Sequence, residues 1–175
     1  GVQTQPARLH AGIAAANYVR ATAVTEAVLD RFLLRAYIAP DYSPFRLLAI
    51  DQAFARNYGY LRTVQPEEQI PLSQLHFLAD IVRGKNAQFQ LAVPPHVLFM
   101  KNAVINRYRE LVAERCAKQK RQPPYTSPRT YAKSRFVLNA AALLGGRREV
   151  TSDDLCELKY VVTTVGGAPE EQQWF

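Results

Sequence analysis

The sequence predicts a mainly α-helical protein, with two short parallel strands near the N-terminus and a four-helix bundle in the C-terminal part. Apolar runs at residues 9–16 and 33–38 predict the strands, because parallel strands buried on both faces are short and continuously apolar. Apolar side chains spaced by threes and fours between residues 73 and 162 predict the bundle. No apolar run approaches the roughly 18 residues that a membrane helix needs.

Prolines and glycines divide the chain into three expected parts. Residues 1–40 hold the two strands, residues 41–66 form a linker, and residues 67–175 form the helical domain. Within the linker, an amphipathic pattern predicts one short helix over residues 45–56. With 175 residues, 48% of them hydrophobic, the chain suits one domain or one and a half.

The first two helices of the bundle are predicted from their ends. Ser73 is expected to cap the first helix, which stops at Gly84. Pro94-Pro95 opens a longer helix that loses its apolar face at Lys118. The first helix is expected to bury Leu75, Leu78 and Val82, and the second Val97, Val104, Tyr108, Leu111 and Val112.

The last two helices carry stronger start signals. Ser127-Pro128-Arg129 places a capping hydroxyl before a proline that suits the first helical turn, and Gly145-Gly146 is a natural stop. Thr151 offers the next cap, with Asp154 at the reciprocal position of a capping box. The buried stripe of the final helix is expected to be Leu155, Leu158 and Val162.

Two polar residues stand where a phosphate could be sensed. Asn17 follows the first predicted strand, and ligands of parallel sheets bind beyond the carboxyl ends of strands. Arg31 follows Asp30 at the corner before the second strand. Taken alone, Asn17 also fits a turn residue, and Arg31 fits a surface ion-pair partner.

These segments resemble a known family. Residues 13–17 (Ile-Ala-Ala-Ala-Asn) and 25–32 (Thr-Glu-Ala-Val-Leu-Asp-Arg-Phe) are similar to AAA+ ATPases of the MoxR family, in particular the RavA-type branch. The resemblance implies that Asn17 is sensor 1, which orients the attacking water. It implies that Arg31 is the arginine finger, which reaches the γ-phosphate held by a neighbouring subunit.

The helical part resembles the lid that follows the core in the same family. Arg129, preceded by Ser127 and Pro128, matches sensor 2, which contacts the nucleotide phosphates of its own subunit. Residues 150–155 (Val-Thr-Ser-Asp-Asp-Leu) resemble the opening of the family's last lid helix. In isolation, Arg129 also fits a solvated arginine of a first helical turn.

The resemblance implies an ATPase whose cofactors are ATP and Mg²⁺. A P-loop needs G-x-x-x-x-G-K-[ST], and the only Gly-Lys pair here, Gly84-Lys85, is followed by Asn86. We therefore expect this chain to be the C-terminal half of the ATPase, inactive alone, with ATP and Mg²⁺ held mainly by the missing half. The family further implies a homo-oligomer, a hexameric ring, that remodels a protein substrate or works with an adaptor.

Two other functions stay open from the residues. One is a non-catalytic helical module that binds protein partners. The other is nucleic-acid binding, suggested by the net charge of +7. No helix-turn-helix spacing, zinc motif or RNA-binding aromatic signature accompanies the basic residues, which disfavours nucleic acid. The basic clusters are Lys118, Lys120, Arg121, Arg147 and Arg148.

The two cysteines bear on the compartment. Cys116 and Cys156 both fall within helical patterns, and we expect buried free thiols. Free thiols are typical of a reducing compartment, so we expect a cytoplasmic protein.

Overall fold

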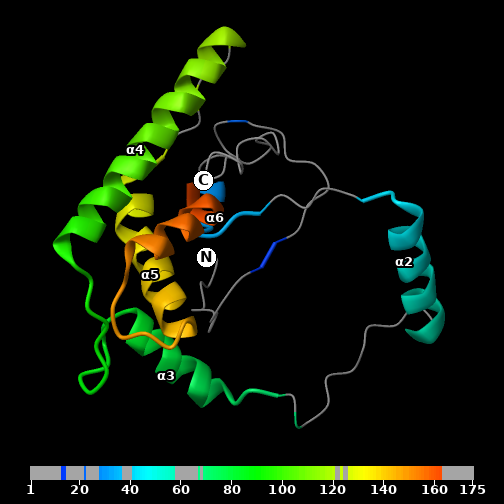
Figure 1. Cartoon of the computed structure of the whole chain (residues 1–175), viewed down its shortest axis with the longest axis horizontal. Helices are drawn as coiled ribbons and strands as arrows, with labels where there is room; N and C mark the ends of the chain where they lie inside the picture. The colour runs from blue at the N-terminus through cyan, green and yellow to red at the C-terminus, as the bar shows by residue number, and fades with distance from the viewer. Residues whose placement is uncertain are drawn as a thin grey trace, which may run out of the picture.

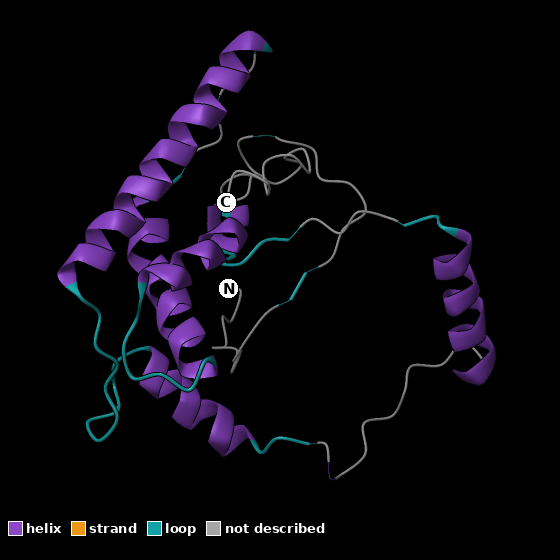
Figure 2. Cartoon of the chain, in the orientation of Figure 1, coloured by secondary structure: helices purple, strands orange, loops and turns teal. Residues whose placement is uncertain are grey.

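The computed structural model describes residues 13–14, 22, 28–36, 41–57, 67, 69–120, 123 and 126–162. Within these ranges the fold is mainly α-helical, as predicted (Figures 1 and 2). The helices are α2 (Pro44–Asn57), α3 (Leu72–Val82), α4 (Pro95–Lys118), α5 (Pro128–Leu144), the 3₁₀ helix η2 (Ser152–Leu158) and α6 (Lys159–Val162).

The described residues contain no β-strand, and their one β-pairing is a parallel bridge between Ala92 and Glu149. Of the strand expected at residues 33–38, residues 33–36 are described and form an extended loop. Its Arg35 N–H donates to the carbonyl oxygen of Tyr160 at 2.6 Å, so the backbone pairs with the end of the bundle. Of the strand expected at residues 9–16, all but two residues lie outside the described ranges.

Helix α2 confirms the short helix predicted within residues 41–66. Ser43 caps it, since its Oγ accepts a hydrogen bond from the N–H of Arg46 at 3.4 Å. Figure 1 shows α2 standing apart from the other helices. Its side chains are exposed, including Phe45 and Phe54 at 87% and 68%. The apolar face of this helix therefore has no cover from the described part of the chain.

Helix α3 begins and ends at backbone signals. It starts after Pro71, whose carbonyl oxygen accepts the N–H of Gln74 at 2.9 Å, so the predicted cap at Ser73 is wrong. The predicted stop at Gly84 is confirmed, because Gly84 adopts a φ of +70°, which a Cβ would strain. Ile81 is the buried residue of α3, whereas Leu75 and Leu78 are exposed.

Helices α4 and α5, η2 and α6 enclose the hydrophobic core. The predicted stripe of α4 is confirmed at three positions, while Val104 and Leu111 are half-buried. The fully buried Ile105 was missed. The stripe predicted for the last helix is confirmed in full. The core comprises Val97, Ile105, Tyr108, Val112, Leu138, Ala142, Val150, Leu155, Leu158, Val161 and Val162.

A buried lysine of α4 makes hydrogen bonds to α5. Lys101 is 4% exposed, and its Nζ donates to the carbonyl oxygen of Tyr131 and to Ser134 Oγ at 3.2 Å. Burial lowers the pKa of Lys101, and the nearby positive charge of Arg135 lowers it further. The ammonium thus acts as a hydrogen-bond donor between two helices.

The remaining predictions about helix ends and thiols have mixed outcomes. Helix α5 stops at Gly145-Gly146 as predicted, with Gly146 at a φ of +68°. Both cysteines are free, but Cys116 is half-buried and Cys156 is exposed, so the predicted burial is wrong for Cys156. Its position on the outer side of η2 leaves the stripe at Leu155 and Leu158 to face the core. None of the described helices has both the length and the apolar character of a membrane span.

Candidate functional site

Arg31 lies in a turn that directly follows the helical residues Val28 and Leu29. Its N–H donates to the carbonyl oxygen of Val28 at 3.0 Å, and the N–H of Phe32 donates to that of Leu29 at 3.0 Å. The Arg31 side chain is exposed.

The side chain of Arg35 makes a hydrogen bond to the residues of this turn. Its Nη2 donates to the carbonyl oxygen of Leu29 at 3.2 Å. Burial lowers the pKa of Arg35, while the charge of Asp30 and then Tyr108 raise it. The segment is also held by Leu33, which packs against the core. The loop that carries Arg31 is thus fixed to the helical bundle.

A hydrogen bond joins this turn to the start of α5. Thr130 Oγ1 donates to Asp30 Oδ1 at 3.2 Å, across 100 residues of sequence. Thr130 is buried at 6% exposure and is the third residue of α5. Arg31 follows Asp30 and Arg129 precedes Thr130, so each arginine is next in sequence to one residue of this contact.

The first turn of α5 has no side-chain cap. Ser127 occupies the N-cap position, but its Oγ is buried and finds no hydrogen-bond partner in the described ranges, so the predicted capping bond is wrong. The N–H of Thr130 donates instead to the carbonyl oxygen of Ser127 at 3.0 Å. The backbone of Ser127 is extended, as in an ordinary N-cap residue, yet its hydroxyl is buried and does not reach the helix N–H groups.

Arg129 is exposed, and the described residues provide neither a hydrogen bond nor an ion pair for its guanidinium. It stands at the positive end of the α5 dipole, where anions are favoured. The structure therefore brings the backbone positions of Arg31 and Arg129 together, while Asn17 lies outside the described residues.

The basic pair Arg147 and Arg148 is engaged in internal contacts. Arg147 Nη2 and Nη1 donate to the two Asp154 carboxylate oxygens at 2.5 and 2.9 Å. Asp154 also accepts the N–H of Thr151 at 2.9 Å, which confirms the predicted capping box. The guanidinium of Arg148 lies over the ring of Phe89, 4.7 Å from its centroid.

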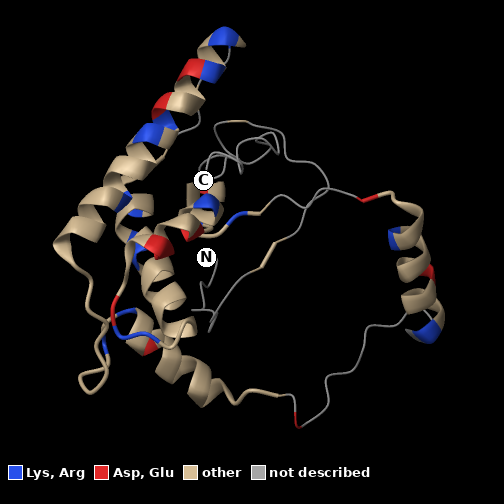
Figure 3. Cartoon of the chain, viewed as in Figure 1, with Lys and Arg blue, Asp and Glu red and all other residues tan. Residues whose placement is uncertain are grey.

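Charges elsewhere on the bundle are mixed. Figure 3 shows acidic and basic residues interleaved along the outer half of α4. There Arg107 pairs with Glu110 at 3.0 Å, with both side chains exposed. Interleaved charges of this kind differ from the one-sided basic stripe that typifies a nucleic-acid surface.

Two cavities open on the described bundle. One, of about 320 Å³, lies beside α4 and is bordered by Asn106 and Arg109. Tyr131 links these two residues, because its hydroxyl donates to Asn106 Oδ1 at 2.7 Å and accepts from Arg109 Nη1 at 3.0 Å. The other cavity, of about 290 Å³, lies between the end of α3 and α5.

Sequence reasoning missed several polar residues that the structure uses. Lys101 and Asn139 are buried and make hydrogen bonds between helices, and the buried Thr130 bonds the Asp30 turn to α5. A signal existed for two of them, because Lys101 and Asn139 interrupt otherwise apolar positions of their helices. The described residues contain no group of three His, Cys, Asp or Glu side chains that could hold a metal ion.

Comparison with models of protein families, with curated proteins and with solved structures finds no match for this chain.

Proposed function

We propose that this chain is the C-terminal part of a MoxR-type AAA+ ATPase, to which it contributes Asn17, Arg31 and Arg129. The observation that carries this proposal is the hydrogen bond from Thr130 to Asp30. It joins the turn that carries Asp30 and the exposed Arg31 to the first turn of α5, which carries Arg129. Two segments that sequence reasoning selected separately, 100 residues apart, thus meet in space.

The residues present fit a phosphate. Both guanidiniums are exposed, the N-terminus of α5 has no side-chain cap, and the Ser127 hydroxyl beneath it has no partner in the described part of the chain. An arginine stays protonated and can offer two N–H groups to two oxygens. Bound ATP with Mg²⁺ would supply the γ-phosphate that is transferred to water.

Each arginine has its own task in this proposal. Arg31 stabilises charge that develops on a phosphate held by the neighbouring subunit of a homo-oligomeric, hexameric ring. Such a finger is worth roughly 10³ to 10⁵ in rate in GTPases. Arg129 holds the phosphates of its own subunit. The Thr130–Asp30 bond then couples the two, because a shift of α5 moves the turn that carries Arg31. The resulting motion drives the remodelling of a protein partner.

The proposal is tested in the protein that includes the P-loop part. Arg31→Ala should abolish ATP turnover and leave nucleotide affinity within about twofold, whereas Arg129→Ala should weaken nucleotide binding. Arg107→Ala, on the exposed face of α4, is the matched control and should change neither. Turnover near the wild-type rate in Arg31→Ala would overturn the finger assignment.

Mixed rings test whether the site is shared. Subunits with Arg31→Ala, mixed with subunits whose P-loop lysine is replaced, should recover part of the turnover, because some interfaces then combine an intact P-loop with an intact Arg31. A mixture that stays inactive, although both variants enter one ring, contradicts action across the subunit boundary.

One observation favours a second function, a non-catalytic module that binds proteins. Helix α2 exposes Leu47, Ile50 and Phe54 on one stripe, and exposed apolar patches mark interaction sites. The coding sequence upstream of Gly1 separates the two functions. A P-loop followed by a strand ending in Asp-Glu supports the ATPase, and the lack of both supports the module.

A further inference from the structure

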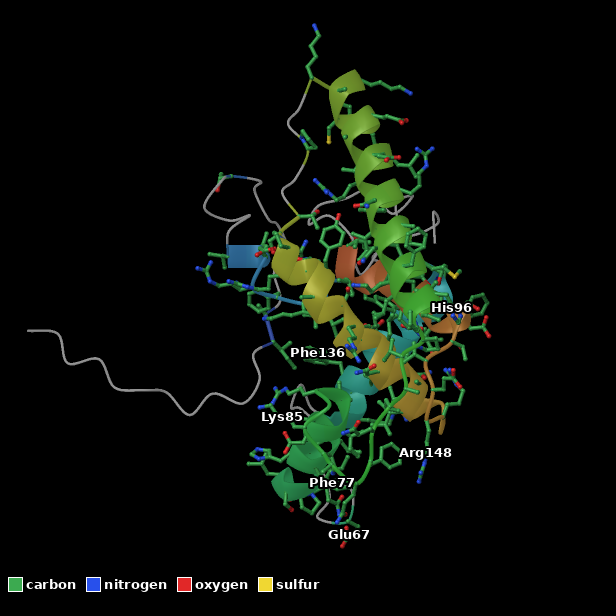
Figure 4. The ribbon with its side chains drawn as sticks, turned by 90° about the vertical axis from the view of Figure 1, so that its left-hand side faces the viewer. Glu67, Phe77, Lys85, His96, Phe136 and Arg148 are labelled. Carbon is green, nitrogen blue, oxygen red and sulfur yellow. The ribbon has the colours of Figure 1, made fainter. Side chains whose placement is uncertain are left out.

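The cavity between α3 and α5 has the features of a small-molecule site. Arg83 and Gly84, just after α3, line one side, and Arg135, Phe136 and Asn139 of α5 line the other. Figure 4 shows Phe136 on α5 above the end of α3, with Lys85 beside that end. Asn139 lies ten residues after Arg129, or about 15 Å along a helix, so this site is separate from the α5 start.

The charge of the cavity is positive and uncompensated. Its lining includes Arg83 and Arg135 and no acidic residue. Within the described residues neither guanidinium makes a hydrogen bond or an ion pair. Both side chains are exposed to solvent, so an anion that enters the cavity would be able to accept hydrogen bonds from them.

Asn139 supplies the second observation. Its Nδ2 donates to the carbonyl oxygen of Val82 at 2.8 Å, which fixes the orientation of the amide. Oδ1 is therefore the remaining polar atom, and it is buried without a hydrogen-bond partner in the described ranges. A buried acceptor of this kind is costly unless a hydroxyl or amine donates to it.

We propose that this cavity binds a small phosphate monoester that carries a free hydroxyl. The phosphate lies between Arg83 and Arg135, and the hydroxyl donates to Asn139 Oδ1. A phosphate monoester carries about −1.5 to −2 charges at neutral pH, which matches two guanidiniums. Ile81 and Phe136 offer apolar contact for the carbon skeleton.

The size of the cavity agrees with this ligand. A volume of about 290 Å³ far exceeds the roughly 30 Å³ that one water takes up in the liquid. A single bridging water would satisfy Asn139 but would leave both guanidiniums without an anion. The site shares no residue with the proposed ATP site. Binding at this cavity can therefore be tested independently of the proposed ATPase function.

Calorimetric titration of the chain with glycerol 3-phosphate, in a buffer free of competing anions, tests the proposal. We expect saturable binding of one ligand per chain. Arg83→Gln and Arg135→Gln should each weaken the affinity by about tenfold or more, since each removes one charge-assisted hydrogen bond. Arg107→Gln is the control and should bind as the wild type does.

Two further ligands test the roles of the hydroxyl and of the phosphate separately. Methyl phosphate, which lacks the hydroxyl, should bind at least about fivefold more weakly than glycerol 3-phosphate, and equal affinity overturns the role of Asn139. Tighter binding of malate overturns the assignment of a phosphate. No saturable binding to a chain that is folded by circular dichroism, or equal weakening by Arg107→Gln, overturns the site.

Discussion

The start of η2 and the start of α5 differ in how completely their polar groups are satisfied. At η2, Thr151, Asp154 and Arg147 form a closed set of hydrogen bonds. At α5, the Ser127 hydroxyl has no partner, and the Arg129 guanidinium has none, in the described part of the chain. Both starts are led by a hydroxyl residue, but only Thr151 has an acid three residues later, Asp154, to complete a capping box.

This difference in hydrogen bonding indicates that the start of η2 serves stability and that the start of α5 serves binding. A closed network rigidifies its surroundings and leaves no group available to a ligand. An open helix start with an exposed arginine is less stable locally, and it is ready to accept an anion. We therefore expect substitutions at η2 to change unfolding, and substitutions at α5 to change function.

The largest effect on stability is expected for Asp154→Ala. The change removes the capping carboxylate and the partner of Arg147, and we expect the free energy of unfolding to fall by about 2 kcal/mol. Urea denaturation measures it. Asp153→Ala, at the exposed neighbouring acid, is the matched control and should cost less than about 0.5 kcal/mol. An equal loss in both variants would remove the distinction on which the comparison rests.

Low pH should remove the contribution of the Asp154 carboxylate to the free energy of unfolding. The hydrogen bond from Arg147 lowers the pKa of Asp154, against the opposing effect of burial. The unfolded value is near 3.9, so the unfolded chain binds this proton more readily. The stabilisation is complete well above that value and disappears as the pH falls through the folded pKa. The stability difference between wild type and Asp154→Asn should therefore narrow from pH 6 to about pH 3. A constant difference would contradict this linkage.

Thr130→Val tests the contact that joins the Arg31 turn to α5. The change keeps the shape of the side chain and removes its hydrogen bond to Asp30, so we expect a loss of about 0.5–1 kcal/mol. Amide exchange of residues 28–36 should accelerate, while that of η2 should not change. Asp30→Asn keeps an acceptor oxygen and serves as the conservative control. Unchanged exchange at residues 28–36 would show that the bond does not hold the turn.

The smallest effect is expected for Ser127→Ala. Its hydroxyl caps nothing, so removal should change the free energy of unfolding by less than about 0.3 kcal/mol. Thr151→Ala, at the satisfied start, should cost about 1 kcal/mol. Thermal unfolding of the two variants side by side measures the contrast, and equal losses would mean that both hydroxyls cap their helices.

Local signals made the helices predictable. Gly84, Gly145-Gly146 and Pro94-Pro95 act through the backbone angles of single residues, and each marks a helix end in the structure. The cap at Ser73 failed because Pro71 already starts that helix. The strand expected at residues 33–38 is wrong over its described part, because a strand needs a neighbouring strand to pair with, and the N–H of Arg35 bonds to the carbonyl oxygen of Tyr160 in α6 instead.

Contacts between distant segments were beyond sequence reasoning. The hydrogen-bond partners of Asp30 and of Lys101 depend on how distant segments pack against α5, which no local pattern encodes. For the candidate site, the sequence could select Arg31 and Arg129 by type and order. It could not show that their neighbours Asp30 and Thr130 form a hydrogen bond. Their roles, and that of Asn17, stay predictions.

The long separation between Asp30 and Thr130 has a consequence for biosynthesis. Residues 28–36 leave the ribosome well before α5 and α6, against which they dock. Contacts so distant in sequence form late, after the closure of a long loop. A partly made chain therefore has no anchored Arg31 turn until α5 and α6 have folded.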